Sequence, residues 1–589
     1  MCGIIGYKGN KNAAEFILSG LSMLEYRGYD SWGVAIKKDN KISTFKKIGK
    51  ISDRTKKDEI ATGTIGMGHT RWATHGGITH ENAHPHTNEN GNIAIVHNGI
   101  IENYQKLKKS LKEKGHEFLS ETDTEVIAHL IEEYEKDFDF FEAFKKALND
   151  IEGSFAIVCM HKDKNELICA RRDSPMVVGV NHKSKEYFVA SDVPAFLEHT
   201  RDVIFMDDNE IVVINDKPTF YNLLNGKKVE KKEQHITWDI AQAKKGDFEH
   251  FMLKEIKEQK ETLKNAISQK DEIIENIANK INSGFGVFFV ASGTSLNAAK
   301  SAAYMFSKHA KKHVNVVDAS EFEYYKDFLT PKTLMITISQ SGETADVLSA
   351  VKTAKKIGVE IISIVNVMGS SLERQSNAAL LMNAGPEICV VATKTYTSQL
   401  AILHLIVYAV SGRLKRGKEW LKYAADHVDE LTNQSEITKL ENLALRLKDC
   451  HHMYIIGRGL SYPTALEAAL KIKEVSYIHA EAFAGGSLKH GPLALIEKGT
   501  PLIVFAPKDE TFNQTITNTI EAKARGAFII GVSPEDNEAF DFHINVPDLN
   551  GTSPIANIIP IQVFAYYLAV LKGLDPDMPR NLAKSVTVK

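Results

Sequence analysis

The second residue of the chain, Cys2, is a cysteine that could act as a nucleophile. Removal of Met1 would expose an α-amine beside its thiol. An α-amine has an unperturbed pKa of about 7.7–8.0, so it can serve as a general base near neutral pH. Such a cysteine carries its own base and needs no separate histidine. The alternative is a buried cysteine at the start of a strand, because Gly3-Ile4-Ile5-Gly6 follows.

Four further residues of the N-terminal part have plain structural interpretations. The pair Asn98-Gly99 is the commonest hairpin signal. Arg71 could form a surface ion pair. Asp123 could be a first-turn carboxylate that the helix dipole favours.

A group of histidines in the same region raises the question of a metal site. The group comprises His69, His75, His80, His84, His86 and His97. No acidic or cysteine partner stands at a recognisable metal-ligand spacing from them. We therefore expect no metal and no cofactor.

A second set of polar residues lies in the middle of the chain, at a predicted strand-to-helix turn. An apolar strand over 334–338 precedes it and a helix with apolar spacing from 347 follows it. The turn consists of Ser339, Gln340, Ser341, Gly342, Glu343 and Thr344. Backbone N–H groups and a helix dipole at such a turn attract phosphate, and no Walker lysine follows. Thr294 and Ser295 could contact the same ligand; the plain alternative is an N-capping turn.

The elements that must position the N-terminal residues mix strands with helices. Apolar runs predict strands over 93–96, 155–158, 187–190 and 211–214. Helices are predicted from Ile101 to a stop at Gly115, and from Val126 to Tyr134. Thr122 and Glu125 have capping-box spacing at the start of the second helix. This mixture favours an α+β layered fold up to about residue 230.

The second half alternates strands with long helices. Strands are predicted over 286–290, 334–339 and 361–365, each followed by a helix, which is typical of a doubly wound parallel α/β sheet. Segment 287–295 resembles 453–461, and 335–344 resembles 503–511, at an offset of about 167 residues. This repeat predicts two tandem α/β domains of similar fold. The second copy has Ala506-Pro507-Lys508-Asp509 where the first has the hydroxyl-rich turn.

Composition argues against several classes of protein. The chain has 72 basic and 75 acidic side chains and a net charge of -3, so neither nucleic acid nor a membrane surface is an expected partner. We expect that no apolar run approaches the roughly 20 residues that cross a bilayer, and the N-terminus lacks signal-peptide features, so we expect a cytoplasmic protein. The 5 cysteines include no C-x-x-C pair, which predicts neither a disulfide framework nor a zinc site.

Five sequence blocks over about residues 2 to 230 resemble the class II glutamine amidotransferase domain. They are Cys2–Gly6, Tyr26–Ser31, His69–Gly76, His97–Gly99 and Glu121–Glu125, in that order. The resemblance implies an N-terminal-nucleophile hydrolase sandwich with αββα layers. It implies that Cys2 attacks glutamine and that Asn98 and Gly99 form the oxyanion hole. Glutamine would be bound by Arg71 at its carboxylate and Asp123 at its amine, with Trp72, Thr74 and His75 lining the pocket.

The second half resembles sugar isomerase domains, which bind phosphosugars at strand-to-helix turns. The resemblance rests on 334–344, Glu467–Glu474, Leu488–Pro492 and Arg580–Val588. Joined to a glutaminase domain, it implies transfer of the amide nitrogen of L-glutamine to D-fructose 6-phosphate, with isomerisation to D-glucosamine 6-phosphate and release of L-glutamate. The implied sugar-phosphate contacts are Thr294, Ser295, Ser339, Gln340, Ser341, Thr344, Val390 and Ala392.

The resemblance also implies roles for four residues near the C-terminus. Lys584 would form a Schiff base with the C2 carbonyl of the opened ketose, and Glu474 would move a proton between C1 and C2. Lys471 could pair with Glu474 or with the open-chain sugar; the simpler interpretation is an i,i+4 ion pair with Glu467. His490 would assist ring opening at a neighbouring subunit's site, which implies a homodimer or a higher homo-oligomer.

Two positions depart from the pattern of the family. Ala392 stands where many relatives have a serine near the sugar, and Ser487 stands where the common motif has a glutamate. Both put the detail of the sugar contacts in doubt. Two alternatives therefore stay open: an amidotransferase acting on a different ketose phosphate, and a phosphosugar-binding regulator with a vestigial glutaminase domain.

Taken together, these features predict five segments along the chain. They are a glutaminase domain at 2–230, a Lys-rich linker at 231–250, a first sugar isomerase domain at 251–435, a second at 436–580 and a C-terminal active-site tail at 581–589.

Overall fold

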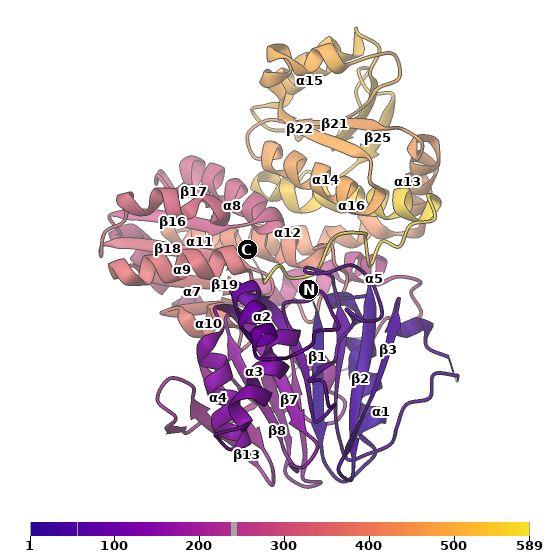
Figure 1. The fold of residues 1–589 in the computed structure, drawn as a ribbon. Helices are drawn as coiled ribbons and strands as arrows, with labels where there is room; N and C mark the ends of the chain where they lie inside the picture. Colours follow the sequence, from indigo (N-terminus) through magenta and orange to yellow (C-terminus); the bar gives the residue numbers. More distant parts are fainter. Residues whose placement is uncertain (1, 56, 237–243, 588–589) are drawn as a thin grey trace. The chain divides into compact units, whose positions relative to one another are not determined.

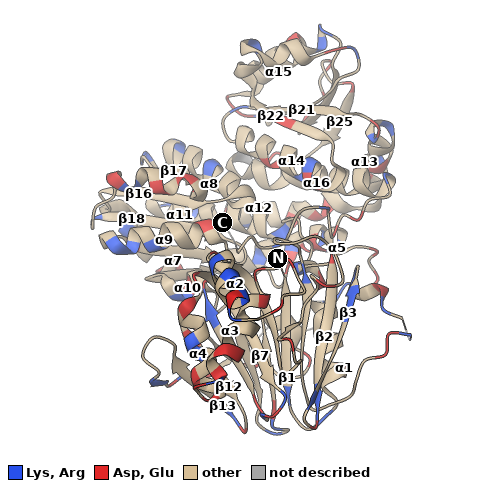
Figure 2. Ribbon diagram, viewed as in Figure 1, with Lys and Arg blue, Asp and Glu red and all other residues tan. Residues whose placement is uncertain are grey.

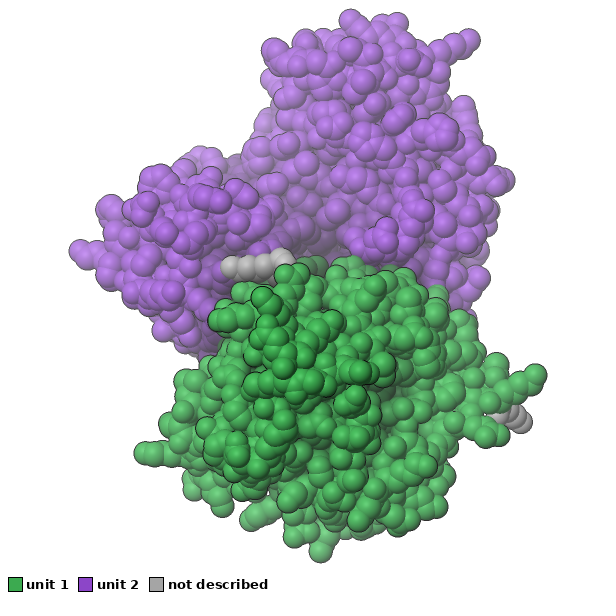
Figure 3. Space-filling view, viewed as in Figure 1, with its two compact units in different colours: residues 1–240, 343–345, 583–589 green, residues 241–342, 346–582 purple. Residues whose placement is uncertain are grey.

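The computed structural model describes residues 2–55, 57–236 and 244–587 (Figure 1). The chain divides into two compact units (Figure 3). Unit 1 comprises residues 1–240, 343–345 and 583–589, and unit 2 comprises 241–342 and 346–582. Three expectations fall partly outside the described residues: the removal of Met1, the middle of the linker at 231–250 and the end of the tail at 581–589.

Within its described residues, unit 1 contains an 8-stranded and a 7-stranded sheet. In spatial order the first sheet is β15 (Gln234–His235), β11 (Asp202–Phe205), β9 (Val177–Asn181), β10 (Glu186–Ala190), β1 (Gly3–Lys8), β4 (Ile65–Arg71), β2 (Ser31–Lys38) and β3 (Lys41–Ile48). The second is β14 (Lys228–Val229), β13 (Pro218–Asn222), β12 (Glu210–Ile214), β8 (Leu167–Arg172), β7 (Gly153–His161), β6 (Ile93–Ile101) and β5 (His86–Thr87). Neighbouring strands are antiparallel in both sheets.

The two sheets of unit 1 pack face to face between helices. Side chains such as Ile4, Val96 and Val158 form the apolar layer between the sheets. Helix α1 (Ala13–Met23) covers the first sheet, and α3 (Glu125–Glu135) and α4 (Phe140–Asp150) cover the second. Helix α2 (Tyr104–Glu113) lies beside α3 and carries lysines on its surface (Figure 2). The αββα sandwich is therefore confirmed, as are the four strands predicted in this part.

The capping box predicted at the start of α3 is wrong. The cap residue is Thr124, which makes no side-chain cap hydrogen bond. The carboxylate of Glu125 instead accepts hydrogen bonds from Leu119 N at 2.8 Å and Ser120 N at 2.7 Å. Spacing alone predicted the box, whereas the fold turns Glu125 toward the preceding loop.

Unit 2 contains two parallel 5-stranded sheets within its described residues. The first runs β17 (Asn315–Asp318), β16 (Gly286–Ala291), β18 (Thr333–Ser339), β19 (Glu360–Val365) and β20 (Ala378–Leu381). The second runs β22 (His479–Ala484), β21 (His452–Gly457), β23 (Pro501–Phe505), β24 (Phe528–Ser533) and β25 (Phe542–Asn545). Numbered along each copy, both have the order 2-1-3-4-5, so the predicted internal repeat is confirmed.

Helices cover both sheets of unit 2. The first copy carries α5 (Phe251–Lys257), α6 (Gln259–Ile267), α7 (Asp271–Ser283), α8 (Gly293–Met305), α9 (Ala345–Ile357), α10 (Ser371–Gln375), α11 (Lys394–Val410) and α12 (Leu414–His427). The second carries α13 (Gln434–Leu447), α14 (Ser461–Ser476), α15 (Phe512–Lys523) and α16 (Ser553–Leu571). Helices α8, α11, α14 and α16 contribute to one apolar core that both copies share.

Helix α16 corrects the expectation that no segment is apolar enough to cross a membrane. Its 19 residues, Ser553–Leu571, meet the requirement by length and composition. However, 83% of its most apolar stretch is buried inside the protein. A helix that is apolar on all sides is expected in the centre of a large core, and α16 packs against α13 and α14 there.

Candidate functional site: a cysteine pocket and a sugar-isomerase repeat

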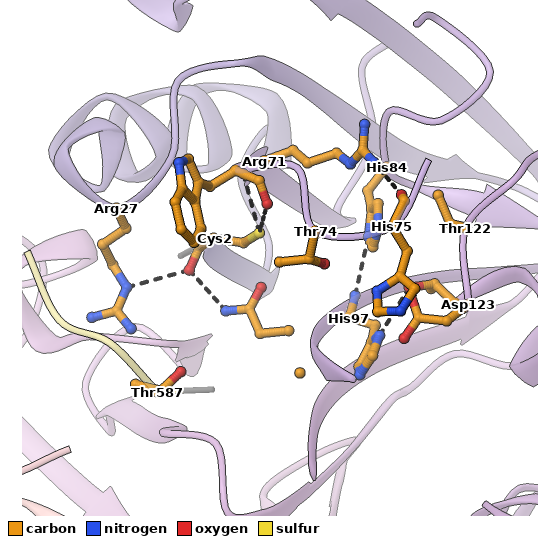
Figure 4. A pocket seen from close by; sticks show the side chains of 14 residues that line it. Cys2, Arg27, Arg71, Thr74, His75, His84, His97, Thr122, Asp123 and Thr587 are labelled. Atoms are coloured by element: carbon orange, nitrogen blue, oxygen red, sulfur yellow. Dashed lines mark hydrogen bonds between the residues drawn. The ribbon is translucent and has the colours of Figure 1, made fainter. Parts of the chain in front are cut away.

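A pocket in unit 1 brings together all the residues predicted to act on glutamine (Figure 4). It is lined by Cys2, Arg27, Arg71, Trp72, Thr74, His75, His84, His97, Asn98, Gly99, Thr122, Asp123, Thr124 and Thr587. Every residue that the resemblance assigned to glutamine or to the nucleophile is in this set. These residues come from the ends of β1, β4 and β6 and from the loops that follow β4 and precede α3.

The nucleophile candidate lies at the beginning of β1, next to the end of β4. The Sγ atom of Cys2 accepts a hydrogen bond from Trp72 N at 3.3 Å and lies 3.5 Å from Trp72 O. Burial raises the pKa of the Cys2 thiol, while the Trp72 backbone and Arg71 act in the opposite direction. The thiol is thus protonated at neutral pH, and attack on an amide requires a base.

The Asn98-Gly99 pair lies beside Cys2, but not in a turn. Both residues are within β6, where they pair with Ala156 and Phe155 of β7, so the hairpin-turn prediction is wrong. Gly99 has a φ of +128°, and a Cβ atom there would collide with the Ser154 carbonyl. The neighbouring backbone therefore leaves room for glycine alone at this position.

The amide of Asn98 is oriented from both sides. His69 Nε2 lies 3.0 Å from Asn98 Oδ1 and 3.0 Å from the His97 carbonyl, so this nitrogen carries the proton and donates. Burial lowers the pKa of His69 to about 3, which keeps the ring neutral. The Nδ2 of Asn98 then points to the Cys2 backbone and donates to Cys2 O at 2.8 Å.

Arg71 supports the loop after β4. Its guanidinium donates to the carbonyls of His75 at 2.6 Å, Gly76 at 3.1 Å and Gly77 at 2.9 Å. The side chain is 3% exposed, and burial lowers its pKa. In this structure Arg71 therefore shapes the loop that carries His75, and its role toward a carboxylate stays a prediction.

Asp123 lies across the pocket, before α3. Its Oδ2 accepts a hydrogen bond from Ile101 N at 2.7 Å, which ties it to the end of β6. The adjacent Thr124 hydroxyl lies 2.8 Å from His97 Nδ1. These contacts hold the segment before α3 against β6, and the role of Asp123 toward an amine stays a prediction.

Three residues of this region were not assigned a role from the sequence. Arg27 donates to Cys2 O at 3.3 Å and pairs with Asp192 at 3.1 Å. Arg27 belongs to the block Tyr26–Ser31, one of the five that resemble the amidotransferase domain, and this membership could have pointed to it. His69 was counted only among the histidines. Thr587, in the C-terminal tail, lines the pocket although it is far away in the sequence.

The hydroxyl-rich turn of the first α/β copy lies between β18 and α9, as predicted. Gly342 N donates to Ser339 Oγ at 3.1 Å, and Gly342 has a φ of +65°. A Cβ atom on Gly342 would collide with the Ser370 hydroxyl. Ser339 is buried, whereas Gln340 and Ser341 are partly exposed. The turn is compact and opens at the carboxyl end of the sheet, where ligands of such sheets bind.

A buried charge cluster links the two copies of unit 2. Lys471 Nζ lies 2.7 Å from Glu474 Oε2 and 3.3 Å from Glu467 Oε1, so the predicted ion pair with Glu467 is present. It also donates to Thr294 Oγ1 at 3.0 Å, and Thr294 in turn donates to Glu467 at 3.0 Å. Burial opposes a charged Lys471, but the two carboxylates outweigh it and raise its pKa.

The remaining predicted residues are spread over several elements. Ser295 is buried in the first turn of α8. Val390 is buried and Ala392 is partly exposed in the loop before α11. His490 is exposed at the end of a short helical segment, Gly485–His490. Lys584 belongs to the tail of unit 1, whereas Lys471 and Glu474 belong to unit 2.

Models of two domain families match the chain. The glutamine amidotransferase domain matches residues 69–198, which include Arg71, Asn98 and Asp123. The SIS domain matches twice, at 282–409 and 446–572, which are the two α/β copies. A solved C-terminal domain of glucosamine-fructose-6-phosphate aminotransferase from Francisella tularensis is 35% identical, with a TM-score of 0.53, and covers 57% of this chain and 99% of its own.

Full-length relatives match from end to end. Glutamine–fructose-6-phosphate aminotransferase (isomerizing) of Thermococcus kodakarensis is 46% identical over 606 residues and covers 100% of both chains. The enzyme of the same name from Clostridium tetani is 43% identical over 614 residues, again with 100% of both chains covered. The chain belongs to the glutamine–fructose-6-phosphate aminotransferase (isomerizing) family.

Proposed function

We propose that this chain transfers the amide nitrogen of L-glutamine to D-fructose 6-phosphate and isomerises the product to D-glucosamine 6-phosphate, with release of L-glutamate. This is the first step of the hexosamine pathway. The observation that carries the proposal is the pocket in which Cys2, Asn98 and Asp123 converge, in a chain that also has two phosphosugar-type domains. L-glutamine and fructose 6-phosphate are the partners.

The glutaminase half begins with removal of Met1. The freed α-amine of Cys2 takes the thiol proton, and Sγ attacks the carboxamide carbon of glutamine. The oxyanion accepts hydrogen bonds from Asn98 Nδ2 and Gly99 N–H. Collapse expels ammonia and leaves a thioester, which water hydrolyses to glutamate. Arg71 binds the glutamine carboxylate, Asp123 holds its amine, and Trp72, Thr74 and His75 line the pocket.

The sugar half uses the C-terminal tail and α14. The Lys584 amine condenses with the C2 carbonyl of the open ketose and releases water; ammonia then displaces Lys584 at C2. Glu474 takes a proton from C1 and returns it to C2, which converts the 2-imine into the 2-amino aldose. Lys471 holds Glu474 in place. The tail that carries Lys584 belongs to unit 1, where Thr587 lines the cysteine pocket.

The phosphate of the sugar lies at the turn of the first copy. Its contacts are Thr294, Ser295, Ser339, Gln340, Ser341, Thr344, Val390 and Ala392. The N–H groups of a turn that opens a helix favour an anion there. His490 assists ring opening at a neighbouring subunit's site, so the working form is a homodimer or a higher homo-oligomer in the cytoplasm. The segment boundaries at 230, 250, 435 and 580 belong to the same proposal.

One assay tests the whole scheme. Purified enzyme is mixed with glutamine and fructose 6-phosphate, and glutamate and glucosamine 6-phosphate are measured together. We expect the two products in equal amounts. Glutamate without amino sugar would indicate a different ketose phosphate as acceptor. Neither product would favour a regulator with a vestigial glutaminase domain. Intact mass measurement should show that Met1 is absent, because the α-amine mechanism fails if Met1 is retained.

A further inference from the structure

A cluster of two histidines and a glutamate lies on the outer side of the second sheet of unit 1, away from the residues described above. His116 lies in the segment between α2 and α3, and His129 and Glu132 stand three residues apart on α3. Residues three apart in a helix share a face. Three atoms converge: Nδ1 of His116, Nδ1 of His129 and Oε2 of Glu132.

The distances between these atoms match the edge of a metal coordination tetrahedron. The two Nδ1 atoms are 3.2 Å apart, and Glu132 Oε2 lies 3.5 Å from His116 Nδ1 and 3.7 Å from His129 Nδ1. Tetrahedral zinc with bonds of about 2.0–2.2 Å holds its ligand atoms roughly 3.3–3.5 Å apart. One ion can therefore contact all three atoms with small side-chain movements.

Neighbours already hold the far sides of His116 and Glu132. His116 Nε2 lies 3.1 Å from Glu133 Oε2, and Asn88 Nδ2 donates to the other oxygen of Glu132 at 2.9 Å. His129 Nε2 lies 3.8 Å from the carboxylate of Glu125 and makes no hydrogen bond to a described residue. Carboxylates behind histidine ligands are typical of metal sites, because they fix the proton on the far nitrogen and turn the near lone pair to the metal.

When Nε2 of both imidazoles carries the proton, lone pairs face one another, because both Nδ1 atoms then meet each other and the Glu132 carboxylate. Glu132 Oε2 is buried and accepts no hydrogen bond from any described residue. His129 is 1% exposed and His116 is 8% exposed. Three acceptors in a largely dry place require a cation among them, either a shared proton or a metal ion.

We propose that His116, His129 and Glu132 form a zinc site with water as the fourth ligand. Two imidazoles and one carboxylate suit zinc among the divalent metals that cells supply. The ion would join the segment that follows α2 to α3. That segment continues to Leu119 and Ser120, whose N–H groups bind Glu125, and then to Asp123 of the glutamine pocket. The role is therefore structural support for one wall of the pocket.

Zinc content and affinity in the full-length protein test the proposal. The purified chain is stripped with a chelator and titrated with zinc against a chromophoric competitor. We expect one tightly bound equivalent per chain, released protons on binding and a higher melting temperature. Cobalt in place of zinc should give the intense visible absorption of four-coordinate Co²⁺. The same equivalent must appear in a Cys2→Ala variant, which separates this site from zinc on the Cys2 thiol.

Variants locate the ion. Glu132→Gln keeps an oxygen for Asn88 but removes the carboxylate, so it should fold and bind zinc at least about 10-fold more weakly. His129→Ala should abolish the site. The matched control is His182→Gln, since His182 is 65% exposed and pairs with Glu233 at 2.9 Å, outside the cluster. Unchanged zinc affinity in Glu132→Gln and His129→Ala, or no tight zinc in the stripped wild type, would overturn the proposal and leave a shared proton as the cation.

Discussion

The two candidate sites of this chain are built in different ways. The glutamine site of unit 1 lies where strands of two facing sheets end, and backbone groups hold its side chains: Trp72 N contacts Cys2, and Ile101 N contacts Asp123. The candidate sugar site instead contains a buried charge cluster around Lys471 and one tight turn. Backbone groups thus hold the side chains of the first site, whereas ion pairs between side chains hold those of the charge cluster.

The strongest test of this contrast is Cys2→Ala. We expect glutamine hydrolysis to fall by about 10⁴-fold or more, because the variant lacks the nucleophile itself. Binding of fructose 6-phosphate should be unchanged, since Cys2 is not among the residues proposed to contact the sugar. Glutamate release and sugar-phosphate binding are measured on the same preparation. Cys450→Ala is the matched control, because Cys450 is partly exposed and lies outside the pocket. Retained glutaminase activity would remove the nucleophile assignment.

The converse variant is Glu474→Gln. Loss of the proton carrier should lower amino-sugar formation by about 10²–10⁴-fold. Glutamine hydrolysis should persist, and Lys471 should stay charged through Glu467 at 3.3 Å, so the fold is preserved. The ratio of glucosamine 6-phosphate to glutamate is the readout. Glu497→Gln, on an exposed side chain of the same copy, should leave this ratio near one. An equal loss of both products would indicate that the two sites are not separable in this way.

Acid should destabilise unit 1 before unit 2. Burial lowers the pKa values of His69, His84 and His97 in unit 1; in unit 2 it does so for His404 and His309. In the unfolded chain a histidine binds a proton at about pH 6.5, whereas the buried His69 ring stays neutral in the folded chain down to about pH 3. The contribution of these histidines to the free energy of unfolding is therefore fully present above pH 6.5. It is lost as the pH falls below 6.5, and for His69 the loss is on the order of a few kcal/mol.

Hydrogen exchange followed by mass spectrometry between pH 7 and about pH 4 measures this order of unfolding. Peptides of β4 and β6 should lose protection before those of β18 and β23. His69→Gln should reduce the acid sensitivity of unit 1, because an amide can donate to the same acceptors without titrating. Earlier loss of protection in unit 2 would contradict the expectation.

The smallest effect is expected at the turn of the first copy. Gly342→Ala places a methyl group against the Ser370 hydroxyl, and it should weaken sugar-phosphate binding by about 1–2 kcal/mol. Gly459→Ala is the matched control in the second copy, since its φ of +54° is similar but its Cβ meets Thr511 Cγ2 at 3.4 Å, an ordinary contact. Isothermal titration with fructose 6-phosphate compares the two. Equal effects of the two substitutions would mean that the turn of the first copy does not bind the sugar phosphate.

Much of the fold could be predicted from the sequence. The strands predicted from the apolar runs at 93–96 and 334–339 are present as β6 and β18. The repeat at an offset of about 167 residues predicted two similar domains, and their sheets have the same strand order. Two of the wrong predictions share one cause. Asn98-Gly99 and the Thr122/Glu125 pair are local signals, and pairing with β7 or with the loop at 119–120 replaced the local structure that they predict.

The sequence by itself determined the chemistry and the family: a cysteine at position 2, the polar residues of the amidotransferase blocks, and a repeated strand–helix pattern. Only the tertiary structure decided which groups meet. The proton on His69 Nε2 that orients the Asn98 amide, the tail residue Thr587 in the cysteine pocket, and Lys471 between two carboxylates all depend on long-range packing. Composition and spacing describe neighbours along the chain, whereas these contacts join residues that only burial of a shared core brings together.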